Sequence, residues 1–182
     1  KICRIMKIGV TGASGMVGIN VCNEILRNGH KLNILLREDV DYLDKLDCNK
    51  FYGDLNNINT LEKFCEKCDV IIHSAAMISI GLDSYDKVYD VNFVGTRNLI
   101  EASIKEKVKK FIFISTVNAF NKKPTDKKFD ETRELVRKGN AYDMTKALAQ
   151  DLVLNTKGID SISINPTSVL GKNDFKPSRL GK

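Results

Sequence analysis

The sequence of 182 residues lacks the features that define several classes of protein. No stretch is long and apolar enough to cross a bilayer, so a transmembrane helix is not predicted. There is no internal repeat and no low-complexity tract, and 42% hydrophobic with 29% charged residues exclude disorder or a collagen-like repeat as the main state. The remaining class is a soluble globular protein of about one domain.

The sequence also lacks a regular set of cysteines. Five cysteines at irregular spacing are an odd number and do not form the framework of a secreted disulfide-rich protein. Cys65-x-x-Cys68 has the spacing of half a zinc site, but no second pair and no nearby histidine accompanies it, so we predict no metal. No segment has the apolar core of a signal peptide, and we expect a cytoplasmic location and no membrane partner.

Aromatic residues are few, at 7%, and they are not interleaved with basic residues as a base-stacking surface requires. The formal net charge of +6 would attract a ligand that carries phosphate. The basic residues are scattered, however, and their densest group, 105–110, is interrupted by Glu106. Solvated faces and loops explain them better than a nucleic-acid groove does.

Short β-branched runs alternate with amphipathic stretches along the chain. Strands are predicted at 6–11, 31–36, 51–52, 70–74, 111–115 and 159–164. Helices are predicted at 16–28, 58–68, 86–107 and 140–156, and a loop-rich interval at 121–138. This alternation predicts an α/β fold, a doubly wound parallel sheet of the Rossmann type with helices on both faces.

A glycine-rich turn joins the first predicted strand to the first predicted helix. Its spacing is Gly-x-x-Gly-x-x-Gly, with Gly12 suited to the tight turn and Gly15 to a close approach of pyrophosphate. Gly18 would let the helix pack closely on the strand. The N-terminus of that helix offers free N–H donors and the positive end of the helix dipole, so the turn predicts a phosphate cradle.

This turn, TGASGMVG, resembles the signature of the extended short-chain dehydrogenase/reductase superfamily, also called the NAD-dependent epimerase/dehydratase superfamily. Further segments follow in the family's order: GDL at 53–55, HSAA at 73–76, DVNFVGTRN at 90–98 and NPTSVLG at 165–171. The last of these is similar to the dihydroflavonol-4-reductase-like subgroup. The resemblance covers nearly the whole chain.

The resemblance implies that a dinucleotide contacts one residue set: Gly12, Ser14, Gly15, Met16, Val17, Gly18, Arg37, Asp54, Leu55, Ala75, Ala76, Asn92, Tyr142, Lys146 and Pro166. It also implies that residues 1–170 form an NAD(P)-binding Rossmann domain and that 171–182 begin the passage to a small C-terminal substrate domain. That domain is expected to be absent or truncated in this sequence.

Tyr142 and Lys146 are four residues apart, so on a helix they share one face. An ammonium near the phenol is expected to lower the phenol pKa, which would let Tyr142 exchange a proton with a carbonyl or alcohol oxygen. By the family pattern S-[ST]-x-x-x-[YF], which ends at Phe120, Thr116 is the hydroxyl that holds the substrate oxygen, with Ser115 as the alternative. Thr116, Tyr142 and Lys146 are thus the predicted catalytic set.

Arg37 follows the second predicted strand, where a carboxylate is typical of NAD-specific folds. A guanidinium can bind a ribose 2′-phosphate, so NADP(H) is the preferred cofactor. If the strand ends one residue later, Glu38 takes the deciding position, and NAD(H) remains possible.

The leading hypothesis is an NADP(H)-dependent oxidoreductase that reduces a ketone or aldehyde, with a small carbonyl or alcohol molecule as its partner. One alternative is a nucleotide-sugar epimerase or dehydratase with tightly bound NAD. Another is a non-enzymatic relative that senses a cofactor or binds nucleic acid. The resemblance also suggests a homodimer through the two long helices, 86–107 and 140–156.

Overall fold

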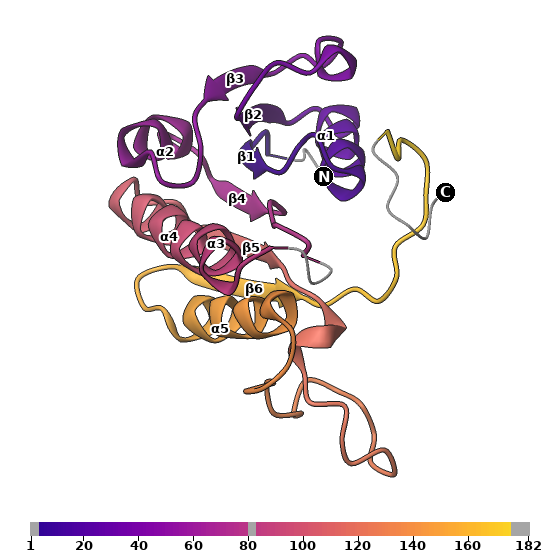
Figure 1. Ribbon diagram of the computed structural model, residues 1–182. Helices are drawn as coiled ribbons and strands as arrows, with labels where there is room; N and C mark the ends of the chain where they lie inside the picture. The colour runs from indigo at the N-terminus through magenta and orange to yellow at the C-terminus, as the bar shows by residue number, and fades with distance from the viewer. Residues whose placement is uncertain (1–3, 80–82, 176–182) are drawn as a thin grey trace.

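A computed structural model describes residues 4–79 and 83–175 (Figure 1). Within these residues the strands form one parallel sheet of six, in the order β3-β2-β1-β4-β5-β6. The strands are β1 (Lys7–Thr11), β2 (Lys31–Leu36), β3 (Asn49–Tyr52), β4 (Val70–His73), β5 (Lys110–Ile114) and β6 (Asp160–Ile164). The order reverses between β1 and β4, as in a doubly wound sheet, so the predicted fold class is confirmed.

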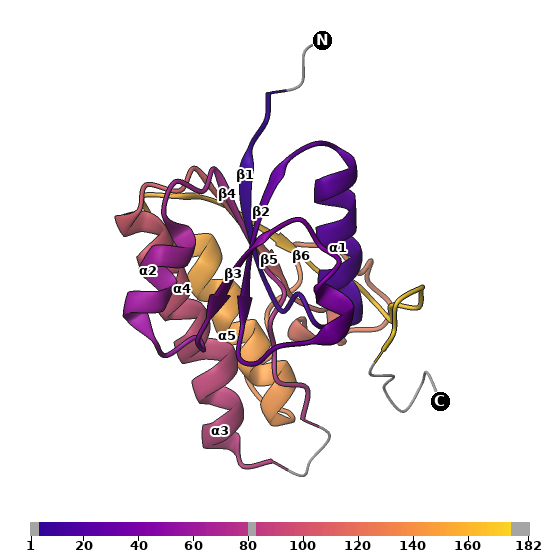
Figure 2. The same cartoon turned by 90° about the horizontal axis from the view of Figure 1, so that it is seen from above.

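Helices cover both faces of the sheet. They are α1 (Met16–Arg27), α2 (Ile58–Cys65), α3 (Tyr85–Tyr89), α4 (Gly95–Lys105) and α5 (Ala141–Asn155). Figure 2 shows α1 on one face and α2, α4 and α5 on the other. None of the helices within the described ranges combines the length and apolarity needed to cross a membrane.

Two apolar clusters hold the helices on the sheet. Phe64, Phe111 and Phe113 lie, fully buried, in the cluster between the sheet and the face of α2, α4 and α5. Val10 and Ile34 belong to the cluster under α1 and are also fully buried. Strands buried on both faces explain why the sequence shows continuous apolar runs instead of alternation.

Most predicted boundaries agree with the structure within two residues, but two helices differ from the prediction. Helix α2 ends at Cys65 instead of Cys68, because Glu66 leaves the helical conformation (ψ 123°) and Lys67 then adopts a left-handed one (φ 59°) before β4. The helix predicted over 86–107 is interrupted. It runs as α3, a π-helical turn η2 (Asp90–Val94), and α4. Such π turns recur at functional sites because they rotate side chains out of the regular α-helical pattern.

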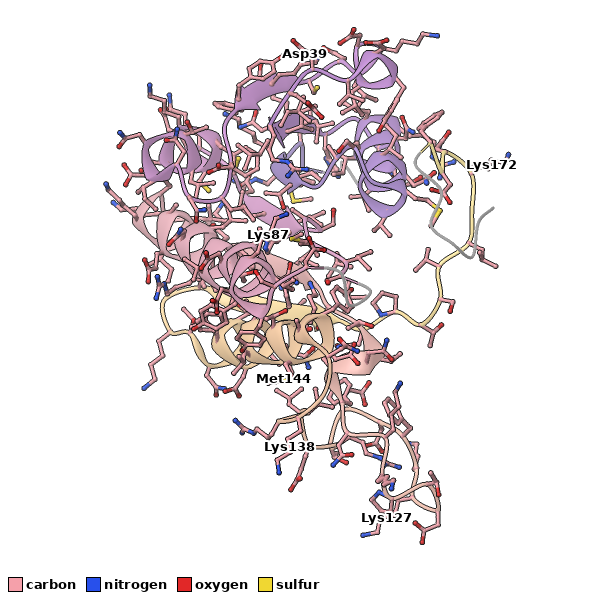
Figure 3. All side chains as sticks on the ribbon, in the orientation of Figure 1. Asp39, Lys87, Lys127, Lys138, Met144 and Lys172 are labelled. Atoms are coloured by element: carbon pink, nitrogen blue, oxygen red, sulfur yellow. The ribbon has the colours of Figure 1, made fainter. Side chains whose placement is uncertain are left out.

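The predicted loop 121–138 projects from the carboxyl edge of the sheet, with Lys127 at its tip (Figure 3). Its two ends run antiparallel: Asn121 N donates to Glu134 O at 2.7 Å, and Val136 N donates to Ala119 O at 2.9 Å. The loop leaves the end of β5 through the short 3₁₀ turn η3 (Val117–Ala119) and returns at the start of α5. The exit of β5 and the first turn of α5 are therefore neighbours.

Candidate functional site

The glycine-rich turn after β1 is shaped by two glycines that the packing requires. Gly12 has a φ of 72°, and a Cβ on it would lie 2.6 Å from the backbone nitrogen of Ala75. A Cβ on Gly18 would lie 2.0 Å from the carbonyl oxygen of Gly12. A side chain at either position would therefore force apart the turn, the exit of β4 or the start of α1.

Gly15 is different, because little of the protein lies in front of it. It is exposed, and beyond its chain neighbours a Cβ on it would meet only the Gly12 oxygen, at 3.4 Å, among residues 4–79 and 83–175. Helix α1 begins there with no side-chain cap and no acidic residue in its first turn. An open approach to uncapped amides and a positive helix dipole fits the pyrophosphate of a dinucleotide.

The predicted neighbours in the turn are placed around this opening. Met16 and Val17 are the first residues of α1, so their backbone N–H groups lie among those without an intrahelical partner. The carbonyl of Ser14 accepts a hydrogen bond from the Tyr42 hydroxyl at 2.7 Å. This bond anchors the middle of the turn to the segment after β2.

The ends of β2 and β3 lie side by side at the same edge. Gly53 N donates to Leu36 O at 2.8 Å, which places exposed Arg37 near exposed Asp54. Asp54 Oδ1 accepts a hydrogen bond from Asn56 N at 2.8 Å. Asp54 and residues 56–59 line a shallow surface hollow of about 440 Å³ that is open to solvent. Leu55 is buried against Gly95, where a Cβ would lie 2.7 Å from the leucine side chain.

The ends of β4 and β6 complete the edge. Ala75 N donates to Thr11 Oγ1 at 3.4 Å, so the exit of β4 rests on the end of β1, and Ala76 is exposed beside it. Pro166 follows β6, and its carbonyl accepts from Val117 N at 3.1 Å. The predicted cofactor residues therefore lie along the carboxyl edge of the sheet. Their contact with a dinucleotide stays a prediction.

The predicted catalytic residues come from two elements that pack together, η3 and α5. Thr116 caps η3, and its Oγ1 accepts from Asn118 N at 3.2 Å. Tyr142 lies in the first turn of α5, and Lys146 lies one turn later. Lys146 Nζ donates to Ile114 O at 2.7 Å, which ties α5 to the end of β5 two residues before Thr116.

Lys146 is buried, with 2% of its surface exposed, and Nζ lies 4.0 Å from the centre of the Phe113 ring. Burial lowers the pKa of Lys146 to about 7, because a charged ammonium loses its hydration there. The electrons of the ring face and the carbonyl of Ile114 offset part of that loss. The lysine can therefore gain or lose its proton near neutral pH.

The expectation that Lys146 lowers the phenol pKa is wrong for this structure. Burial raises the pKa of Tyr142, and the nearby carboxylate of Asp143 raises it further. Among the described residues no hydrogen bond joins Tyr142 to Lys146, and Nζ donates instead to the Ile114 carbonyl. A desolvated phenol without a cationic partner keeps its proton.

Asn92 lies on the π-helical turn and is 1% exposed. Its Oδ1 accepts from Met77 N at 2.7 Å, and its Nδ2 donates to Met77 O at 3.1 Å and to Thr145 Oγ1 at 3.1 Å. The side chain thus joins the exit of β4 to α5. The sequence pattern does not reveal this role, because the partners Met77 and Thr145 are distant from Asn92 in the sequence. Contact of Asn92 with a dinucleotide stays a prediction.

Two other sequence candidates have clear positions. Ser115, the alternative to Thr116, is buried, and its Oγ has no hydrogen-bond partner among the described residues.

Burial raises the pKa of Cys65 to about 12 and that of Cys68 to about 11, so both thiols keep their protons at neutral pH. Within the described ranges no group of three or more His, Cys, Asp or Glu side chains could hold a metal ion.

Comparison with known proteins agrees with this geometry. The chain is 32% identical over 178 residues to sterol demethylase protein B of Methylococcus capsulatus, covering 95% of this chain and 54% of the relative. It is 28% identical over 179 residues to the "Putative dihydroflavonol 4-reductase" of Synechocystis, covering 95% and 52%. The crystal structure of gox2253 superimposes with a TM-score of 0.84 at 27% identity, covering 97% of this chain and 56% of that one.

The chain thus spans about half the length of the relatives it matches. Residues 8–182 match the NAD dependent epimerase/dehydratase family. The match includes the glycine-rich turn, the interrupted helix and the Tyr/Lys pair that the structure places at one edge of the sheet. The chain therefore belongs to the NAD dependent epimerase/dehydratase family.

Proposed function

We propose that the chain is the dinucleotide-binding part of an NADP(H)-dependent oxidoreductase that reduces a ketone or aldehyde, similar to dihydroflavonol 4-reductases. The observation that carries the proposal is the opening at Gly15, where α1 begins without a side-chain cap and a Cβ would meet one atom of the described residues within 4 Å. Membership of a family named for NAD dependence supports a dinucleotide as the ligand. The similarity to a protein named as a dihydroflavonol 4-reductase supports the reaction class.

Arg37 supports NADP(H) over NAD(H). Its side chain is exposed directly after β2, and among the described residues no carboxylate forms an ion pair with it. The carboxylate of Asp39, two residues later, already accepts a hydrogen bond from the Tyr52 hydroxyl at 2.5 Å. The guanidinium is therefore free to bind a 2′-phosphate with two parallel hydrogen bonds.

The dinucleotide, when bound, supplies the hydride for reduction. Tyr142 suits the role of proton donor, because burial keeps its hydroxyl protonated at neutral pH. In the proposed reaction its Oη gives a proton to the substrate oxygen as that oxygen gains charge. Thr116 would hold the same oxygen by a hydrogen bond. Lys146 would hold the ribose, with its ammonium form favoured below its pKa of about 7.

Titration with NADPH and with NADH, followed by the fluorescence of the reduced nicotinamide, tests the proposal. The chain has no tryptophan, so protein emission interferes little. We expect tighter binding of NADPH, and we expect Arg37→Ser to abolish that preference. Arg27→Ser is the matched control, because Arg27 lies at the far end of α1 and pairs with Glu24.

Two outcomes would contradict the proposal. Binding of neither dinucleotide would remove the cofactor role of the Gly15 opening. Preference for NADH in the wild type, with dinucleotide retained through purification, would instead favour a nucleotide-sugar epimerase or dehydratase.

A further inference from the structure

His73, the last residue of β4, is fully buried and has no part in the function proposed above. Both ring nitrogens are bonded to threonine hydroxyls from other elements. Nδ1 lies 2.6 Å from Thr11 Oγ1 at the end of β1, and Nε2 lies 2.9 Å from Thr96 Oγ1 on α4. The ring therefore joins the strand before the glycine-rich turn to the helix after the π-helical turn.

The direction of these hydrogen bonds follows from the chemistry of their partners. Thr96 Oγ1 donates its only proton to the carbonyl oxygen of Asn92 at 2.6 Å, because a carbonyl can only accept. Toward His73 the hydroxyl of Thr96 must then accept, so the proton of the ring is on Nε2.

The other side of the ring agrees with this assignment. Burial and the nearby Lys146 lower the pKa of His73 to about 3, so the ring is neutral and Nδ1 carries no proton. Thr11 Oγ1 consequently donates to Nδ1 and accepts from Ala75 N at 3.4 Å. From Ala75 N through Thr11 Oγ1, the His73 ring and Thr96 Oγ1 to Asn92 O, each group donates a hydrogen bond to the next. Hydrogen bonds in a chain of this kind polarise and strengthen one another.

The series continues into the helix that carries the proposed proton donor. Asn92 Nδ2 donates to Thr145 Oγ1 at 3.1 Å, and Thr145 Oγ1 donates to Ala141 O at 2.7 Å, in the first turn of α5 beside Tyr142. The amide of Asn92 also holds the backbone of Met77. The cradle side of the site and the Tyr142 side are thus parts of one buried hydrogen-bonded frame.

We propose that His73, as the neutral ring with its proton on Nε2, is a positioning residue that sets the distance between the glycine-rich turn and Tyr142. This inference rests on the proposed function, since the distance matters only where a dinucleotide and Tyr142 act on one substrate. A displacement of about 1 Å between reacting groups can lower a rate by roughly a hundredfold, so a buried spacer of fixed polarity affects turnover directly.

Nitrogen NMR of the ring tests the proton assignment without any ligand. The chain has two histidines, His30 and His73, so a His30→Gln variant identifies the signals. We expect His73 to show a protonated Nε2 and a bare Nδ1, unchanged between pH 5 and 8. A proton on Nδ1, or titration within that range, would overturn the inference.

Substitutions at Thr96 test the positioning role in the intact protein. Thr96→Val keeps the volume and removes the hydroxyl, and we expect kcat to fall about 10- to 100-fold while KM for the carbonyl substrate changes less than about threefold. Thr96→Ser keeps the hydroxyl and should restore most of kcat. Ser103→Ala is the matched control on α4, because Ser103 Oγ donates to Leu99 O at 2.7 Å outside this frame.

The outcomes separate this inference from the function on which it rests. If Thr96→Val retains the wild-type kcat, or lowers it no more than Ser103→Ala does, His73 is only a structural residue. If the wild-type chain binds no dinucleotide, the proposed function fails and the positioning role fails with it. The NMR measurement still decides the form of the ring in that case.

Discussion

Lys146 offers the sharpest test of the electrostatics at the site. Its pKa is lowered from 10.5 to about 7 by burial. Between these values the unfolded chain holds a proton that the folded chain has released, so stability rises with pH through that window. Below the folded pKa both states are protonated, and the cost of burying the charge is fully present.

The magnitude follows from the shift. A difference of about 3.5 pKa units corresponds to about 5 kcal/mol of destabilisation at low pH, at about 1.4 kcal/mol per unit. Raising the pH from 7 to 9 should relieve about 2 kcal/mol of it. His73, whose pKa is lowered from 6.5 to about 3, differs in protonation between the two states mainly below pH 7 and contributes little to the change.

The perturbation is Lys146→Met, which keeps the length of the side chain and removes the titrating group. Urea unfolding at pH 7, 8 and 9 gives the free energy of unfolding of the variant and of the wild type. We expect the wild type to gain about 2 kcal/mol relative to the variant between pH 7 and 9. Contributions from the thiols occur in both proteins and cancel in the difference.

Lys105→Met is the matched control, because Lys105 lies exposed on α4 and pairs with Glu62 at 2.6 Å. Its stability relative to the wild type should not depend on pH in this range. A Lys146→Met difference that stays constant from pH 7 to 9, or that changes in the opposite direction, would refute a desolvated lysine with a pKa near 7.

Three further predictions concern the turn, the thiols and α5. Gly15→Ala should leave the midpoint of urea unfolding nearly unchanged and weaken dinucleotide binding. Gly18→Ala should lower the midpoint, because its Cβ would lie 2.0 Å from a carbonyl oxygen. Equal effects of the two variants on stability would contradict the packing. Alkylation at pH 8 should modify half-buried Cys48 well before buried Cys65, as followed by mass spectrometry, and the reverse order would contradict the burial. Asn140→Ala removes the side-chain cap of α5 and should cost about 1 kcal/mol in urea unfolding; no loss would show that the cap is dispensable.

Much of the fold could be predicted from local patterns. Buried strands such as β4 and β5 are continuous apolar runs, and Asn140 and the glycine-rich turn mark helix starts by their chemistry. The end of α2 could not be predicted, because nothing in the sequence at Lys67 demands a left-handed residue. The π-helical turn could not be predicted either, since an extra residue in one turn leaves no residue type that marks it in the sequence.

The candidate site divides in the same way. The positions of Gly12, Gly15 and Gly18 follow from their spacing, since backbone conformation at a turn depends on a few neighbouring residues. The protonation of Tyr142 and Lys146 depends on burial by elements distant in the sequence, and helical spacing alone therefore predicts the wrong direction for the Tyr142 pKa.

The parallel α/β architecture, the glycine-rich turn and the proposed acid–base residues could all be inferred from the amino-acid sequence, because each depends on short-range pattern and residue type. Which groups are desolvated, and how the buried frame from Thr11 through His73 to Thr145 is connected, became visible from the folded structure alone. Those properties depend on which strands and helices meet, and hydrogen-bond polarity and dielectric environment exist only once they have met.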